Sequence, residues 1–266
     1  MRRLGTPLLV AALGALGVVA ALDAVDSAKP PAARPLETAA ALPQLPRDAS
    51  TRLLRAGVRG TIGYSDTECG RHELALPGLG RRDFLTRGCD VFSRQGNLGI
   101  EDGNVAWFAF PGGTTPLLTR SQLDAALGGQ RHRVRDVAWL GGTRFAALIA
   151  QPGRHGHVVA IFDRHRLERV VTRVGPTWTE VRSSGRGSYF AVLHPAGGLA
   201  VYDREGDLVG PPRTLRLARS IAWSPDERWA ALVTRRSLWI MRSERALTPL
   251  VQLPLGAVDV DWRRAL

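Results

Sequence analysis

The sequence predicts an all-β fold built from repeated four-stranded units, a β-propeller. A short strand-opening phrase recurs, and its fourth residue falls at positions 93, 139, 182, 223 and 262, at intervals of 46, 43, 41 and 39 residues. A period of about 40–45 residues with four short strands per unit is typical of propeller blades. The phrases are Asp90–Ser93, Asp136–Trp139, Thr179–Arg182, Ser220–Trp223 and Asp259–Trp262.

The units also share an internal order, because each complete phrase is followed by a turn, an apolar run, a second turn and a third strand. β-Branched and aromatic residues are frequent in the runs, as expected for half-buried strands. The predicted second strands are Phe145–Ala150, Tyr189–Leu193 and Trp229–Val233. The predicted third strands are Val105–Phe110, His157–Phe162, Leu199–Tyr202 and Leu238–Met241. Weaker fourth strands are predicted at Arg169–Arg173 and Pro249–Leu253.

The first and last copies are incomplete in complementary ways. Gly60–Ser65 and Glu73–Leu76 read as second and third strands without a first, whereas Val258–Trp262 reads as a first strand alone. We therefore expect the C-terminal strand to complete the N-terminal unit, which gives five blades and removes free sheet edges. The alternative is an open, irregular β-sandwich.

One unit resembles a known repeat. Trp223–Ala230, with the sequence WSPDERWA, is similar to the SPDGR repeat of the TolB-like and WD40-like β-propellers. Glu227 stands where that repeat has glycine, and the other units lack the Ser-Pro-Asp sequence. The resemblance covers roughly Gly60 to Trp262 and implies a fold, because propellers carry many different functions.

The N-terminus predicts a membrane anchor. Leu4–Leu22 contains no charged residue and follows Arg2 and Arg3; at about 1.5 Å per residue it is long enough to cross a bilayer core. A cleaved signal peptide is the alternative. In both cases the body lies outside the cytoplasm, either held at the membrane by a single-pass anchor or secreted.

We divide the chain into an anchor or signal segment at 1–28, a Pro/Ala-rich spacer at 29–56 and a propeller-like domain at 57–266. The spacer ends in a short predicted helix, Ser50–Arg55, that stops before Gly57. A second helix, Ser121–Leu127, is expected to begin with Ser121 as N-cap and to end at Gly128.

The chain is strongly basic, with a net charge of +12, and Lys29 is the single lysine among 36 basic residues. An arginine-covered face attracts anionic polymers or lipid head groups. Nucleic acid is not an expected partner, because the body is exported and no basic helix or aromatic-interleaved basic motif is present.

The chain has two cysteines, Cys69 and Cys89, and an even pair in an exported protein predicts a disulfide bond. Free thiols are the alternative. His155 and His157 have the spacing of a metal pair, but they fall in a predicted turn where exposed histidines are ordinary. We therefore predict no metal site at these histidines. We also predict no cofactor and no catalytic residue.

The repeat alignment places five polar residues at the start of the innermost strands, where they would surround one mouth of a central channel. They are Asp90, Asp136, Thr179, Ser220 and Asp259. Three carboxylates and two hydroxyls favour a cation or a polar ligand. The alternative is structural, because Asp, Ser and Thr commonly secure strand starts through local backbone hydrogen bonds. At the end of the same phrases, Trp139, Trp223 and Trp262 are expected to pack in the core.

These features favour a non-catalytic binding or scaffold module for a protein, a peptide or a cell-envelope polymer. A glycosidase-like propeller hydrolase is one alternative, because Asp90, Asp136 and Asp259 could serve as the paired carboxylates that such enzymes need. An extracytoplasmic sensor domain is another, which would need a membrane partner to supply its output.

Overall fold

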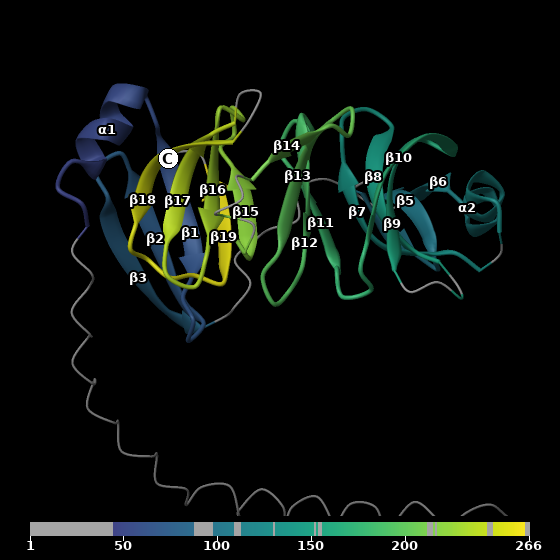
Figure 1. Cartoon of the computed structure of the whole chain (residues 1–266), viewed down its shortest axis with the longest axis horizontal. Helices are drawn as coiled ribbons and strands as arrows, with labels where there is room; N and C mark the ends of the chain where they lie inside the picture. Colours follow the sequence, from purple (N-terminus) through teal and green to yellow (C-terminus); the bar gives the residue numbers. More distant parts are fainter. Residues whose placement is uncertain are drawn as a thin grey trace, which may run out of the picture. The chain divides into compact units, whose positions relative to one another are not determined.

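A computed structural model describes residues 45–87, 98–108, 113–129, 131–151, 153, 156–211, 215, 217–243 and 247–263. The chain divides into two compact units, Met1–Leu42 and Pro43–Leu266. The described residues all belong to the second unit, so the predicted anchor, Leu4–Leu22, lies outside them. The described residues of this unit form two short helices and five antiparallel sheets (Figure 1).

The first sheet joins the two ends of the body, as the sequence predicts. Its strand order is β19 (Asp259–Arg263), β1 (Gly60–Ser65), β2 (Gly70–Leu76) and β3 (Gly80–Arg87). β1 pairs with β19 in antiparallel register, with Ile62 opposite Trp262 and Tyr64 opposite Val260. The predicted closure of the first unit by the last strand is therefore confirmed.

Each of the other four sheets is formed by strands consecutive in sequence. The second contains β4 (Leu98–Glu101), β5 (Asn104–Phe108) and β6 (Thr114–Leu118). The third contains β7 (Arg133–Trp139), β8 (Arg144–Ala150), β9 (His157–Asp163) and β10 (Arg166–Val174). The fourth contains β11 (Glu180–Ser183), β12 (Tyr189–Leu193), β13 (Leu199–Asp203) and β14 (Leu208–Gly210). The fifth contains β15 (Ser220–Trp223), β16 (Trp229–Val233), β17 (Leu238–Arg242) and β18 (Thr248–Leu253).

The second strands of the units are buried on both faces, which explains why their sequences are continuous apolar runs. Every residue of β16 is buried, and so is the interior of β8. A strand reads this way when other layers cover both faces of its sheet. Four apolar clusters provide these layers, and each is shared by two sheets: first with fifth, fifth with fourth, fourth with third, and third with second.

This serial packing of antiparallel sheets, four of them with four strands and the second with three among the described residues, fits a β-propeller. The predicted strands Tyr189–Leu193 and Trp229–Val233 are confirmed with the same bounds. The segment 88–97, which connects the first and second sheets, lies outside the described residues. Closure of the ring between these two sheets therefore stays a prediction.

Both predicted helices are present, each with a difference. Helix α1 (Ala49–Ala56) ends at Gly57, which has a φ of +73°, but Ala49 and Leu53 are buried in the cluster shared by the first and fifth sheets. The predicted boundary at residue 57 therefore separates this helix from the core on which it packs. No helix in the described part of the chain is long and apolar enough to span a membrane.

Helix α2 (Arg120–Leu127) begins one residue before the predicted start. Its N-cap is Thr119, whose hydroxyl accepts from the backbone N of Gln122, while the Gln122 side chain accepts from Thr119 N. This capping box replaces the predicted cap at Ser121, because only Thr119 has glutamine three residues later. Gly128 ends the helix as predicted.

Of the three tryptophans expected in the core, two are buried. Trp262 is 1% exposed and Trp223 is 6% exposed. Trp139 is only partly buried, and its Nε1 donates to the carbonyl of Gly142 in the following turn. The prediction for Trp139 is therefore only partly met.

Candidate functional site

The predicted channel-mouth residues have different environments in the structure. Asp136, Ser220 and Asp259 are buried, with exposures of 4%, 1% and 4%. Thr179 is exposed and lies just before β11, because the first strand of that sheet begins at Glu180. Asp90 lies outside the described residues.

A buried arginine joins two of these residues. Arg182 Nη1 donates to Asp259 Oδ1 at 2.7 Å and to Ser220 Oγ at 2.6 Å. Ser220 Oγ donates to the same Asp259 oxygen at 2.7 Å. Since Arg182, Ser220 and Asp259 lie on β11, β15 and β19, this network links the fourth, fifth and first sheets.

The charge of Arg182 is balanced inside the protein. Burial would lower the pKa of Arg182, but the negative charges of Asp259 and Glu180 outweigh burial and raise it. Glu180 accepts from Arg182 Nε at 2.5 Å. An internal guanidinium thus provides a positive charge beside Asp259 and Ser220, two of the residues that the sequence suggested for a cation or a polar ligand.

Asp136 makes a similar connection between another pair of sheets. Its Oδ2 accepts from the backbone N of Val181 at 2.9 Å, which ties β7 in the third sheet to β11 in the fourth. Asp136, Ser220 and Asp259 therefore form hydrogen bonds between sheets, whereas the structural alternative placed them in local bonds at their own strand starts. No group of three or more His, Cys, Asp or Glu side chains among the described residues is arranged to hold a metal ion.

A second polar cluster lies on the first sheet around His72, which is 8% exposed. Its Nδ1 lies 2.7 Å from Asp83 Oδ1, and its Nε2 lies 2.8 Å from Asp66 Oδ2. The Tyr64 ring lies beside the His72 ring, with 4.9 Å between centroids. Burial raises the pKa of Tyr64 to about 12, so its hydroxyl stays protonated at neutral pH.

The Asp66 carboxylate of this cluster is expected to make the free energy of unfolding depend on pH in the acid range. Burial alone would raise the pKa of Asp66, but hydrogen bonds from His72 and from the backbone N–H groups of Gly70 and Glu68 lower it below its ordinary value of 3.8. A carboxyl group with a lowered folded-state pKa stabilises the fold fully above the unfolded-state value and progressively less below it.

We therefore expect Asp66→Asn to be less stable than the wild type at neutral pH, with a difference that shrinks as the pH falls below about 3.8. Urea unfolding at a series of pH values measures it. Asp102→Asn, in the exposed β4–β5 turn, is the control and should show no such convergence. A difference that stays constant through acid pH would contradict the role of the Asp66 charge.

At the other end of the sheets, the turn that resembles a propeller repeat contacts its neighbour. Glu227 has a φ of +61°, the left-handed region that favours the glycine of the SPDGR pattern. Its side chain is 7% exposed, and its carboxylate accepts from the backbone N of Arg186 in the β11–β12 turn. The departure from the repeat therefore provides a hydrogen bond between the fourth and fifth sheets.

We expect Glu227→Ala to destabilise the fold by about 1.5–3 kcal/mol, because it removes a charged hydrogen-bond acceptor and keeps the backbone strain. Glu227→Gly loses the same bond but relieves about 1 kcal/mol of backbone strain, so it should be the milder change. Chemical denaturation of both variants measures the difference. If alanine were tolerated better than glycine, the strain assigned to Glu227 would be wrong.

The same turn borders a pocket of about 450 Å³. Its lining includes Arg59, which precedes β1, Arg186 in the β11–β12 turn, and Ser224, Asp226 and Trp229 in and after the β15–β16 turn. Three segments far apart in the sequence thus meet at one site. The repeat in the sequence does not predict this site, although the glutamate in place of glycine at position 227 is a signal of it.

The predicted disulfide is only partly within the described residues. No described cysteine is free, and Cys69 is disulfide-bonded. Its predicted partner, Cys89, lies outside the described residues, so the pairing of Cys69 with Cys89 stays a prediction. His155 is also outside them. His157 is buried, and its Nδ1 donates to the carbonyl of Trp178 at 2.9 Å, so the expectation of an exposed turn residue is wrong for His157.

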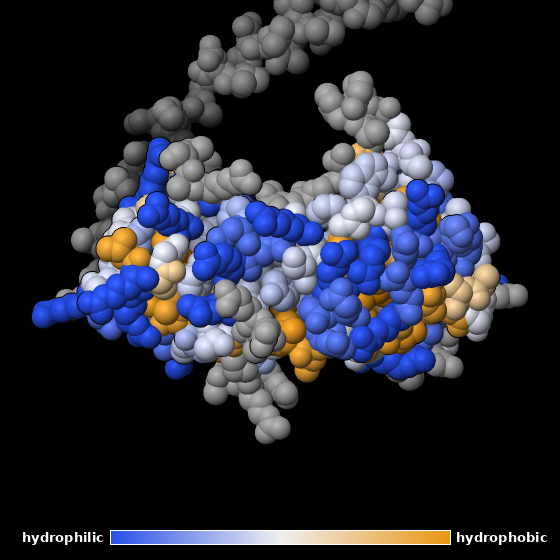
Figure 2. All heavy atoms as spheres, turned by 90° about the horizontal axis from the view of Figure 1, so that it is seen from above, coloured by the Kyte–Doolittle hydropathy of each residue, from blue (hydrophilic) through white to orange (hydrophobic). Residues whose placement is uncertain are grey.

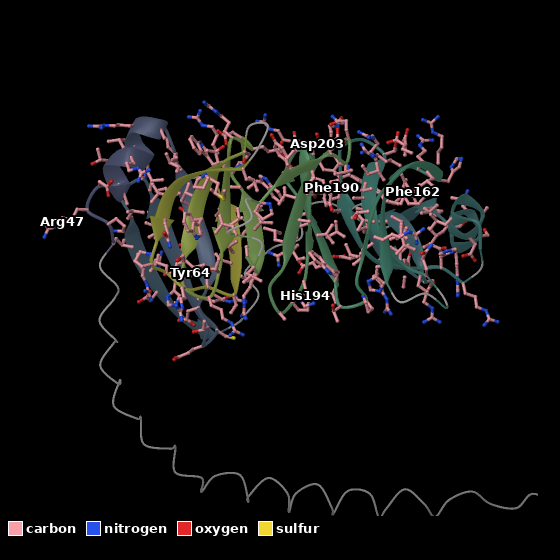
Figure 3. All side chains as sticks on the ribbon, viewed as in Figure 1. Arg47, Tyr64, Phe162, Phe190, His194 and Asp203 are labelled. Carbon is pink, nitrogen blue, oxygen red and sulfur yellow. The ribbon has the colours of Figure 1, made fainter. Side chains whose placement is uncertain are left out.

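The predicted channel-mouth position of the fourth sheet, Thr179, and the pocket residue Arg186 can be located relative to each other. Figure 3 shows His194 and Asp203 at opposite ends of this sheet, with Phe190 between them. Thr179, just before β11, bonds through its backbone N to Leu193, next to His194. Tyr189, next to the turn that contains Arg186, pairs with Asp203. The predicted mouth position of this sheet and the pocket residue Arg186 therefore lie at opposite ends of it.

Comparison with known proteins gives no family assignment. No protein-family model and no curated protein sequence matches the chain. Among solved structures, it is similar to the hydrazine synthase of Kuenenia stuttgartiensis, with a TM-score of 0.38 and 11% identity over 73% of this chain and 48% of that chain. It is also similar to the C-terminal WD40 domain of Sif2, with a TM-score of 0.34 and 13% identity over 47% of this chain and 39% of that chain.

The chain thus spans about half the length of the hydrazine synthase chain, and it spans less than half the length of the Sif2 domain chain. The assignment of a propeller-like fold depends on the serial packing of the sheets and on the strand closure between β1 and β19.

Proposed function

We propose that this chain is a membrane-anchored, extracytoplasmic five-bladed β-propeller of the TolB-like or WD40-like kind, acting as a non-catalytic binding or scaffold module. One observation carries the proposal. Three of the polar residues at the strand starts, Asp136, Ser220 and Asp259, form hydrogen bonds between sheets. This assigns them to holding the blades together and leaves the exposed turns for recognition.

The anchor part of the proposal is supported by the charge-free segment Leu4–Leu22 behind Arg2 and Arg3. Basic residues flanking an apolar span stay on the cytoplasmic side, which would place the body outside. The partner is a protein, a peptide or a cell-envelope polymer. The Cys69–Cys89 disulfide belongs to the same proposal, because such bonds persist in oxidising compartments.

Membrane fractionation and protease accessibility in intact cells test the location. The wild-type chain should be released from membranes only by detergent and should be cleaved by external protease once any outer barrier is opened. Leu13→Arg, in the middle of the apolar segment, should impair insertion, because a central arginine costs about 2.5–3.5 kcal/mol on the insertion scale. Leu36→Arg, in the spacer, is the matched control and should behave as the wild type. A wild-type chain that stays protease-resistant in the cytoplasmic fraction would overturn the proposal.

A further inference from the structure

The pocket beside the β15–β16 turn combines two arginines from separate segments. Arg59 and Arg186 both line it, and both are exposed. Within the described residues, neither guanidinium forms an ion pair. Two arginines that line one concave site favour the binding of an anion.

The backbone at both arginines is held in place. The carbonyl of Arg59 accepts from Trp262 Nε1 at 3.3 Å, and the backbone N of Arg186 donates to the Glu227 carboxylate. Each arginine is thus fixed at its main chain by a residue from another part of the fold. A site positioned in this way loses less entropy when a ligand binds.

The pocket also contains one carboxylate, Asp226, which opposes an anion. Its Oδ1 accepts from Ser224 Oγ at 2.6 Å and from the backbone N of Arg228 at 3.2 Å. These donors use part of its accepting capacity within its own turn. Two arginines and one aspartate give the lining residues a net positive charge, while the nearby carboxylate of Glu227 accepts from the backbone N of Arg186.

We propose that this pocket binds a carboxylate or phosphate group of a polar ligand through Arg59 and Arg186. Guanidinium groups suit both anions, because their planar donors match two oxygens at once. The volume of about 450 Å³ lies within the range of small-molecule sites. Figure 2 shows the body from the side where Asp203 lies in Figure 3, and hydrophilic residues cover most of that face.

This inference deepens the proposed function. It rests on that function only for the source of the ligand, a cell-envelope polymer. In a cell-envelope polymer, the anion would be an acidic sugar or a phosphate. The binding test below uses small molecules and purified protein, so its outcome does not depend on where the chain is located. A failure of this test and a failure of the location test are therefore distinguishable.

The test is calorimetric titration of the full-length chain in neutral detergent at low salt, with inorganic phosphate, galacturonate and galactose as separate probes. We expect phosphate or galacturonate to bind, and galactose, which has no charge, not to bind. Binding of phosphate alone would assign the ligand to phosphate-bearing polymers, and binding of galacturonate alone would assign it to acidic saccharides.

Three variants locate the binding. Arg59→Gln with Arg186→Gln should weaken it by about tenfold or more, since two charge-assisted contacts are lost. Asp226→Asn should strengthen it by about two- to fivefold, because a like charge is removed while an acceptor for Ser224 remains. Arg120→Gln with Arg166→Gln, two exposed arginines outside the pocket lining, is the control and should leave the affinity unchanged.

The Asp226→Asn variant keeps the proposal testable even if the double arginine variant is unstable. Lack of binding of both charged probes to the wild type would overturn the proposal. So would equal binding of galactose, equal weakening in the control variant, or weaker anion binding by Asp226→Asn.

Discussion

Replacement of Arg182 by methionine is expected to lower the free energy of unfolding by about 3–5 kcal/mol, because it removes the guanidinium charge that compensates the buried carboxylate of Asp259. Arg182 is 7% exposed on its side chain and Asp259 is 5% exposed. Water therefore cannot replace the lost guanidinium without opening the contact among three sheets. Urea unfolding followed by tryptophan fluorescence measures the change.

The control for this substitution is Arg186→Met. Arg186 is an exposed residue of the following turn, so the change should fall within about 0.5 kcal/mol. The double variant Arg182→Met with Asp259→Asn should lose less stability than the two single changes together, because both ends of one ion pair are removed. Equal effects of Arg182→Met and Arg186→Met would show that the network does not hold the sheets together.

The second large effect is expected at Gly187, in the β11–β12 turn. It has a φ of +77°, and an added Cβ would lie 2.4 Å from the carbonyl carbon of Leu140 and 2.8 Å from Gly141 N. Those atoms belong to the backbone of the β7–β8 turn in the neighbouring sheet, which cannot move aside as a flexible side chain can. We expect Gly187→Ala to cost about 1–3 kcal/mol for overpacking, in addition to the strain of the left-handed conformation.

Gly103→Ala separates the two contributions. Gly103 lies in the β4–β5 turn with a φ of +80°, and an added Cβ there meets nothing within 4 Å. It should therefore show the conformational strain alone, about 1 kcal/mol. Chemical denaturation of both variants gives the excess at Gly187, which reports on the contact between the third and fourth sheets. If both substitutions cost the same, that contact contributes nothing.

Much of the fold could be predicted because the second strands of the blades are buried on both faces. Continuous apolar runs such as Tyr189–Leu193 and Trp229–Val233 mark such strands directly. The pairing of β1 with β19 could also be predicted, since each end of the repeat lacked the strand that the other supplied. The capping of α2 was misplaced because Ser121 and Thr119 both suit an N-cap, and only the residue three positions later distinguishes them.

The site was harder to predict, because the repeat shows which positions are equivalent but not which side chains meet between blades. Asp136, Ser220 and Asp259 were found as a class, but Arg182 was treated only as the end of its phrase. Its long side chain reaches two neighbouring sheets, a distance that no local spacing encodes. The pocket brings together residues 59, 186 and 226, and the tertiary fold alone makes them neighbours.

The pairing of β1 with β19 also sets the order in which the molecule can be completed. Trp262 bonds to Arg59, which is 203 positions earlier in the chain. The first blade therefore lacks its innermost strand until nearly all of the body has been synthesised, and domains otherwise tend to fold as their own residues emerge. The first sheet therefore keeps an unpaired strand edge throughout the synthesis of the other four sheets, and β19 covers that edge last.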